Sequence, residues 1–127
     1  MKNIKVFGLN LDPDERYESI STKISNVNSN IKDPYEIVSD KLKDSNEIRY
    51  IKVGKVQVEP WLIPTPNKED LFMVDVDNLV AFIDADGCRE YAEKVKEFVK
   101  EKIFPDIPLM IGVDHSGTGG CIEAIAE

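Results

Sequence analysis

The residues of this 127-residue chain that are best placed to do chemistry are Asp114, His115 and Ser116. They follow an apolar run at 108–113 and precede a glycine-rich segment at 117–120. An acid, an imidazole and a hydroxyl in consecutive positions can hold a metal ion, move a proton or orient one another. His115 is the only histidine, so sites that need two histidines, such as His-Glu-x-x-His, are excluded.

The elements next to these residues predict how they are positioned. The near-continuous apolar run at 108–113 is typical of a strand covered on both faces of a parallel sheet, and we expect residues 109–112 to lie inside that sheet. Before it, apolar residues recur at helical spacing over 88–104, and Pro105 ends that helix. The face that this helix should bury consists of Ala92, Val95, Phe98, Val99 and Ile103.

The rest of the chain alternates between strand and helix signals. We expect strands at 4–8 and 79–83, a strand or hairpin at 48–58, and helices at 15–25 and from 121 to 126. Asp33 should cap a helix that runs to about residue 43, and Asp86 should cap the helix at 88–104. This order predicts a single α/β domain over 1–127, a three-layer α/β/α arrangement with a mainly parallel sheet.

The segment Gly112-Val113-Asp114-His115-Ser116 resembles the Gly-Gly-Asp-His-Ser motif of the ureohydrolase superfamily, the binuclear manganese hydrolases of the arginase and agmatinase type. The surrounding order is similar as well: a long helix, a Pro-x-x-Pro turn, an apolar strand, the motif, and a helix that begins with small residues. The resemblance implies a partial arginase-like fold and metal-dependent hydrolysis of a guanidino or related C–N bond in a small cationic substrate.

By this resemblance His115 is a ligand of manganese or another divalent metal, and Asp114 and Ser116 orient the imidazole and its loop. The family's other ligands come from an Asp-Ala-His-x-Asp-like motif and an Asp-x-Asp motif farther along, and neither occurs here. We therefore expect an incomplete ureohydrolase-like domain that binds metal weakly and is inactive alone. Self-association or a completing polypeptide is expected with it.

Other interpretations of the same segment stay open. Asp114 and His115 can be ordinary loop residues that cap a helix or form hydrogen bonds at a strand end. The chain can also be a noncatalytic interaction subunit. A third alternative is a phosphate- or nucleotide-binding loop, whose amides would come from Gly117, Thr118, Gly119 and Gly120.

Composition narrows the class of partner. Sixteen basic against 24 acidic residues give a net charge of −8, which disfavours nucleic acid and acidic membrane surfaces. No run reaches the roughly 20 apolar residues of a membrane span, and the N-terminus lacks signal-peptide features, so we expect a cytoplasmic protein. Seven acidic residues within 69–90 form either a solvated face or a rim that attracts cations.

Overall fold

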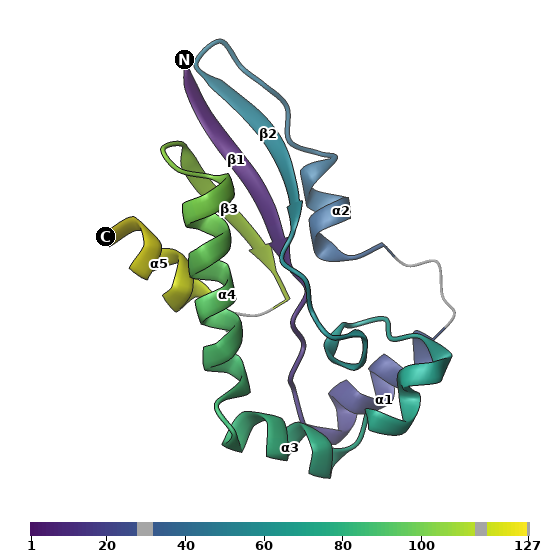
Figure 1. The fold of residues 1–127 in the computed structure, drawn as a ribbon. Coiled ribbons are helices and arrows are strands. Elements are labelled where there is room, and N and C mark those ends of the chain that lie inside the picture. The colour runs from purple at the N-terminus through teal and green to yellow at the C-terminus, as the bar shows by residue number, and fades with distance from the viewer. Residues whose placement is uncertain (28–31, 114–116, 127) are drawn as a thin grey trace.

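The computed structural model describes residues 1–27, 32–113 and 117–126 (Figure 1). Within these residues two α-helices separate each strand from the next, and two short 3-10 helices lie between the second strand and the third α-helix. In chain order the elements are β1 (Lys2–Leu9), α1 (Tyr17–Ser25), α2 (Pro34–Ser39), β2 (Ile48–Lys55), η1 (Pro60–Leu62), η2 (Lys68–Met73), α3 (Val76–Asp84), α4 (Gly87–Lys102), β3 (Ile107–Gly112) and α5 (Thr118–Ala126).

The three strands form one parallel sheet in the order β2-β1-β3. Lys2 of β1 aligns with Ile48 of β2, and Leu9 aligns with Gly112 at the other end of β3. The β1–β2 register shifts between Val6 and Phe7, which accommodates Gly54 at a φ of 106° in the left-handed region. The prediction for 48–58 is thereby resolved in favour of a strand, because β2 pairs with β1 and forms no hairpin.

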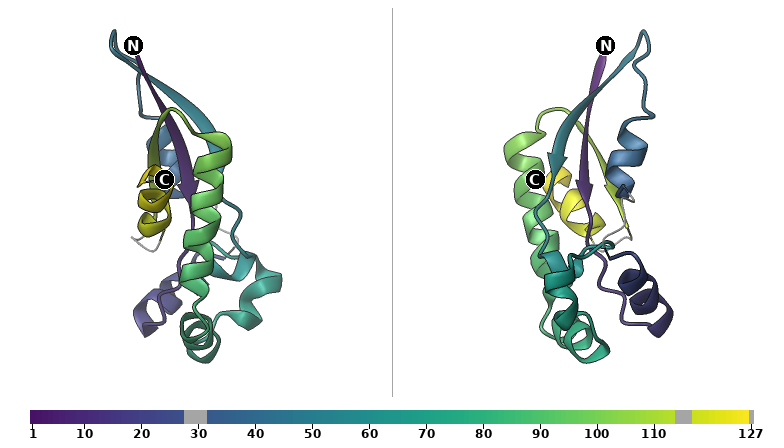
Figure 2. Two further views of the ribbon diagram at one scale, coloured as in Figure 1. Left: turned by 60° about the vertical axis from the view of Figure 1, so that its left-hand side comes forward. Right: turned by 90° about the vertical axis from the view of Figure 1, so that its right-hand side faces the viewer.

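Helices cover both faces of the sheet, so the predicted α/β architecture is confirmed. In the right-hand view of Figure 2, α4 and α2 lie on opposite sides of the strands. Parallel strands joined by right-handed crossovers produce this arrangement when the chain moves first one way along the sheet and then the other. The helix α5 packs on α4 and contacts β3, on the face opposite α2.

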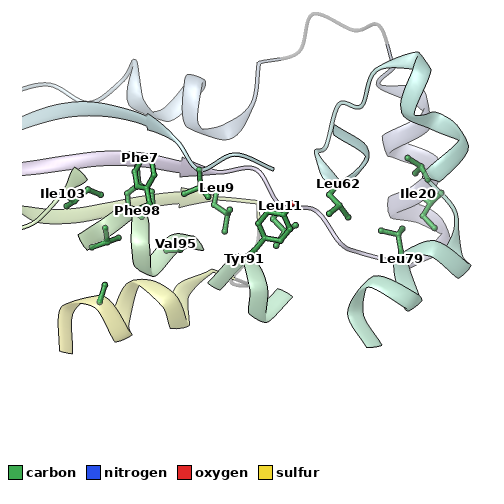
Figure 3. Close-up of a cluster of buried hydrophobic side chains, with 14 residues drawn as sticks. Phe7, Leu9, Leu11, Ile20, Leu62, Leu79, Tyr91, Val95, Phe98 and Ile103 are labelled. Carbon is green, nitrogen blue, oxygen red and sulfur yellow. The ribbon is translucent and has the colours of Figure 1, made fainter. Parts of the chain in front are cut away.

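The main core lies between the sheet and α4 (Figure 3). Val95 and Val99 are fully buried, and the Phe98 ring stacks on Phe7 with centroids 5.2 Å apart. The predicted buried face of this helix is therefore confirmed, although Ala92 is only partly buried. Tyr91, which the prediction omitted, belongs to the same core, and its hydroxyl oxygen accepts the Glu59 amide proton at 3.0 Å.

A second group of buried side chains lies beyond the carboxyl ends of the strands. Leu11, Leu62 and Leu79 are almost fully buried there, and Ile20 of α1 packs with them. Figure 3 shows Leu62, Ile20 and Leu79 between α1, η1 and α3, and Leu11 nearer to Tyr91 of α4. These elements therefore form a small lobe at the edge of the sheet where ligands bind in open α/β folds.

Three sequence predictions were wrong. Residues 79–83 belong to the helix α3 and not to a strand, because Asp75 accepts the Asn78 amide at 2.7 Å and starts a helix there. Strand β3 was expected inside the sheet but lies at the edge of the three described strands. An apolar run indicates that both faces of a strand are covered, and it does not show that the strand has a neighbour on each side. Asp86 makes no side-chain cap for α4, because it occupies the left-handed region at a φ of 60°.

None of the described helices has the length and apolar content that a membrane span requires.

Candidate functional site

The candidate site lies at the carboxyl edge of the sheet, around the segment 10–12 that follows β1. Strand β1 is central, and the chain continues from it to α2 on one face, whereas the chain from β3 continues to α5 on the other face. Such a reversal opens a crevice between the two strand ends, which is where open α/β folds hold ligands. Two hollows flank the segment: one on the β3 side and one on the β2 side.

The residues that the sequence singled out, Asp114, His115 and Ser116, lie outside the described residues. The structure describes the residues on either side of them. Gly112 ends β3 opposite Leu9, the last residue of β1, and the next residue, Val113, lines the hollow on the β3 side. The described residues that precede the three, Gly112 and Val113, therefore lie at the carboxyl edge of the sheet.

The glycine-rich segment has a packing role in the structure. A Cβ on Gly117 would collide with the Leu9 side chain, and one on Gly120 would collide with the backbone oxygen of Ala92 in α4. These two glycines let α5 approach β1 and α4 closely. Thr118 and Gly119 are partly or fully exposed at the start of α5, and the proposal of an anion-binding loop stays a prediction.

The hollow on the β3 side, which we call the β1/β3 hollow, has a volume of about 380 Å³. It is lined by Asp12, Asp14, Glu18, Ser19, Thr22, Lys23, Asn26, Pro64 and Val113. Among these described lining residues, three carry carboxylates and Lys23 alone is basic, so the wall of the hollow is suited to a positively charged ligand.

Lys23 is the most deeply buried charged group of this hollow, with 2% of its surface exposed. Its ammonium donates to the backbone oxygen of Asp12 at 2.7 Å and lies 3.9 Å from a carboxylate oxygen of the same residue. Burial lowers the pKa of Lys23, although the charges of Asp12 and Asp14 oppose that change. The side chain thereby ties α1 to the segment after β1.

Asp14 holds a guanidinium group from its own chain. Arg16 Nε lies 3.0 Å from both carboxylate oxygens, Nη2 lies 2.6 Å from Oδ2, and the Ser19 hydroxyl donates to Oδ2 at 2.6 Å. The Arg16 hydrogen bond, followed by that of Ser19, holds the pKa of Asp14 well below its usual range. This carboxylate therefore stays charged at any physiological pH and has the geometry for a planar cation.

A metal centre needs several ligands close together. Within residues 1–27, 32–113 and 117–126, no three histidine, cysteine or acidic side chains are grouped closely enough to hold a metal ion. The pair of Asp14 with Arg16 also makes Asp14 a poor metal ligand. The described residues therefore do not by themselves fit the manganese centre that the resemblance implies.

The hollow on the β2 side, which we call the β1/β2 hollow, has a volume of about 550 Å³. Its polar side chains converge on Asp33: Asn10 Nδ2 and Lys55 Nζ each lie 2.7 Å from Asp33 Oδ2. Asp33 Oδ1 accepts the Glu36 amide at 2.8 Å and so caps α2, which confirms the predicted cap. Lys55 also lies 3.4 Å from Glu36 Oε1.

The charges in this hollow reinforce one another. Burial alone would raise the pKa of Asp33, but hydrogen bonds from Lys55, the Glu36 amide and Asn10 outweigh it and hold that pKa below its ordinary value. The hydrogen bond to Asp33 raises the pKa of Lys55 in turn. Both groups are therefore charged over the whole neutral range.

Asn10 carries an unsatisfied polar atom. The residue is 8% exposed, and its Oδ1 is buried without a hydrogen-bond partner in the described part of the chain. The orientation of the amide is fixed, because the opposite orientation would place an oxygen against the Asp33 carboxylate. A buried acceptor left unpaired costs about 1–3 kcal/mol, so its retention calls for a functional or structural reason.

Sequence reasoning missed Asn10, Lys23 and Lys55 as site residues. Asn10 carried a usable signal, since a polar residue directly after an apolar strand in an α/β protein lies at the ligand-binding edge. Lys23 and Lys55 carried none, because a lysine in a polar helix or at a strand end is ordinarily solvated.

Comparisons of the chain with protein-family models, with curated proteins and with solved structures found no match.

Proposed function

We propose that the chain is a ureohydrolase-like segment of a metal-dependent hydrolase acting on a guanidino or related C–N bond of a small cationic substrate. Manganese or another divalent ion would be held by His115 together with ligands from a further chain segment or a partner, since the described residues do not form a metal centre. A cytoplasmic location is part of the proposal.

The observation that carries the proposal is the position of Gly112. It ends β3 beside the end of the central strand β1, so the segment that resembles the family's Gly-Gly-Asp-His-Ser motif begins at the topological switch point. Asp12 and Asp14 come from the neighbouring strand end and line the same hollow. A guanidinium ligand suits this wall, because Asp14 already binds the guanidinium of Arg16.

The outer edge of β3 supports the need for a completing segment. No described strand pairs with that edge, and Ile107 at the start of β3 and Val113 directly after it are exposed. A parallel strand with an open edge is a template for further pairing. The same surface favours a second candidate function, a noncatalytic interaction subunit that uses this edge to bind a partner.

Titration calorimetry with Mn²⁺ and an assay of urea release from guanidino compounds test the proposal. We expect weak binding that is lost in His115→Ala, and no turnover by the chain alone. Co-expression with neighbouring reading frames should yield a complex whose urea release depends on His115. Tight binding that is unchanged in His115→Ala would overturn the ligand assignment, and a complex that forms but never hydrolyses would favour the interaction subunit.

A further inference from the structure

We propose that the outer face of α3 is a docking surface for a partner polypeptide, one that presents an amphipathic helix with lysine or arginine beside its apolar stripe. The helix α3 belongs to the small lobe and lies at the end of the molecule opposite the amino terminus (Figure 1). Residues 76–84 line neither the β1/β2 nor the β1/β3 hollow, so the inference does not depend on metal binding or hydrolysis.

The outer face of α3 carries an apolar stripe. Val76, Val80 and Ile83 are spaced by four and then three residues, which places them on one side of the helix. Their exposed fractions lie between 37% and 47%, whereas Leu79 on the inner side is fully buried. Phe72 in the preceding helix η2 is 77% exposed and adds an aromatic side chain to the surface of the same lobe. Exposed apolar side chains that gather on one element are typical of a protein interaction surface.

The charged residues beside this stripe are all acidic. Residues 69–86 contain six acids and no lysine, arginine or histidine, so they contribute −6 to a net charge of −8. Asp77 and Asp84 are seven residues apart and therefore lie along one flank of the stripe. In the described ranges, none of the six carboxylates forms an ion pair with a basic side chain. The six are Glu69, Asp70, Asp75, Asp77, Asp84 and Asp86.

Charge complementarity decides the chemistry of the partner. Unpaired carboxylates repel one another in the free chain, and ammonium or guanidinium groups of a partner relieve that repulsion on binding. The carboxylates of Asp33 and Glu36 differ in this respect, because Lys55 already pairs with both. Nucleic acid and anionic membrane surfaces would be repelled by the same charges. A stripe with spacings of four and three residues is complementary to a second helix laid along it, so the expected partner is a basic amphipathic helix.

The described helices of the chain itself do not match this requirement. The helix α5 exposes Ile122 and Ile125, but its one charged residue within Thr118–Ala126 is Glu123. The helix α4 mixes glutamates with lysines on its exposed side. A second copy of the chain is therefore a poorer occupant than a basic helix from another polypeptide.

Titration of the ¹⁵N-labelled chain with a helical peptide of about 15 leucine and lysine residues, with leucine at i, i+3, i+4 and i+7, tests the surface. We expect the amide signals of 69–86 to shift in a saturable way, with those of α2 and β2 unchanged. A scrambled peptide of the same composition should bind at least about tenfold more weakly, because it lacks the apolar stripe. A peptide with glutamate in place of lysine should not bind.

Three results would overturn the proposal. Equal binding of the scrambled peptide would show that charge alone attracts the probe. Saturable shifts centred outside 69–86 would place the docking surface elsewhere. Shifts of 69–86 that appear when the concentration of the chain is raised without peptide would show that a second copy occupies this face.

A pair of valine variants tests the apolar contact. Val80→Ser should weaken binding of the leucine and lysine peptide about tenfold, because it removes the middle side chain of the stripe. Val38→Ser is the matched control, since Val38 lies in α2 and is 41% exposed, close to the 38% of Val80. It should leave the affinity unchanged. Equal affinities of the two variants would contradict the surface.

A pair of double variants tests the charge contact independently. Asp77→Asn combined with Asp84→Asn should weaken binding about tenfold and reduce its dependence on salt. Glu97→Gln combined with Glu101→Gln removes two exposed charges from α4 and should leave the affinity unchanged. Wild-type amide signals in β1 verify that each variant is folded. The same loss in both double variants would show attraction by net charge alone and would overturn the proposal.

Discussion

The β1/β2 and β1/β3 hollows flank the same three-residue segment, yet their lysines behave in opposite ways. Lys55 is 39% exposed and is paired with the carboxylate of Asp33, which raises its pKa. Lys23 is almost completely buried and donates chiefly to a backbone oxygen, and burial lowers its pKa. A lysine near aspartates therefore acts either as an ion-pair partner or as a buried hydrogen-bond donor to the backbone. Which of the two it is depends on whether the favourable contacts of its ammonium group outweigh the cost of its desolvation.

The difference extends to the carboxylates. Asp33 is nearly buried, and four groups depend on it: the α2 cap, Asn10, Lys55 and, through Lys55, Glu36. Asp14 is paired with Arg16, whose side chain is 78% exposed. The first carboxylate therefore organises the fold around its hollow, whereas the second forms a local pair with an exposed guanidinium.

The largest effect that we predict comes from Gly8→Ala, which would displace α2 from the sheet. The new Cβ would lie 2.7 Å from Tyr35 Cβ and 2.8 Å from Cγ, atoms at the root of a buried side chain that cannot move without the helix. We expect a loss of about 2–3 kcal/mol in the free energy of unfolding. Urea denaturation measures it, with Gly119→Ala as the control, since that position has open space and should not lose stability.

Asp33→Ala should be the next largest effect. It removes the cap of α2 and leaves Asn10 and Lys55 without their shared acceptor, which should cost about 2 kcal/mol. Asp14→Ala on the other side should cost less than about 1 kcal/mol, as is usual for an exposed pair. Equal losses in the two variants would contradict the contrast between the hollows.

The pH dependence of the unfolding free energy in acid gives an independent check on the role of Asp33. Its pKa in the folded chain lies below the ordinary 3.8, so its contribution to stability is complete above pH 3.8 and is lost as the pH falls through the lower folded value. The difference in unfolding free energy between wild type and Asp33→Ala should therefore shrink as the pH falls below 3.8. A difference that stays constant there would show that the loss comes from packing alone.

Replacing Lys55 or Lys23 with methionine separates the ion-pair role from the buried hydrogen-bonding role, with smaller expected changes in the free energy of unfolding. Lys55→Met removes the charge that faces Asp33 and should cost about 1 kcal/mol. Lys23→Met removes a buried charge as well as its bond to Asp12, two effects that should nearly cancel. Destabilisation of Lys23→Met beyond that of Lys55→Met would reverse our interpretation of the comparison.

Alkaline pH should move the contributions of these lysines in opposite directions. The pKa of Lys55 lies above 10.5 in the folded chain, so its contribution is complete below pH 10.5 and is lost as the pH rises through the folded value. The pKa of Lys23 lies below 10.5, so its desolvation penalty at neutral pH is relieved as the pH rises through the folded value. Unfolding measured from pH 8 to 11 in the two methionine variants should show these opposite trends against wild type.

Local patterns in the sequence predicted the fold where local physics decides it. The spacing of Val95, Phe98 and Val99 predicted the buried face of α4, and Asp33 before a proline predicted the start of α2. Residues 79–83 were misassigned because a five-residue apolar run has no period long enough to separate strand from helix. Asp75, the cap that decides the matter, lies four residues before that run.

The candidate site was predictable only in part, because its contacts join segments far apart in the chain. Asn10, Asp33 and Lys55 meet through the parallel register of β1 and β2 and the docking of α2, neither of which a local pattern encodes. The glycines at 117 and 120 illustrate the same limit. Their spacing resembled an anion-binding loop, whereas their close contacts with Leu9 and Ala92 give them a packing reason that only the fold reveals.

The most direct test of the proposed metal-dependent function is paramagnetic broadening by Mn²⁺ in the ¹⁵N-labelled chain, with His115→Ala alongside. We predict that substoichiometric Mn²⁺ broadens the amide signals of Asp12, Asp14 and Val113 first, because these residues lie at the strand ends next to the motif-like segment. His115→Ala should abolish that pattern. Broadening centred on the acidic stretch 69–90, or a pattern unchanged in His115→Ala, would contradict the account.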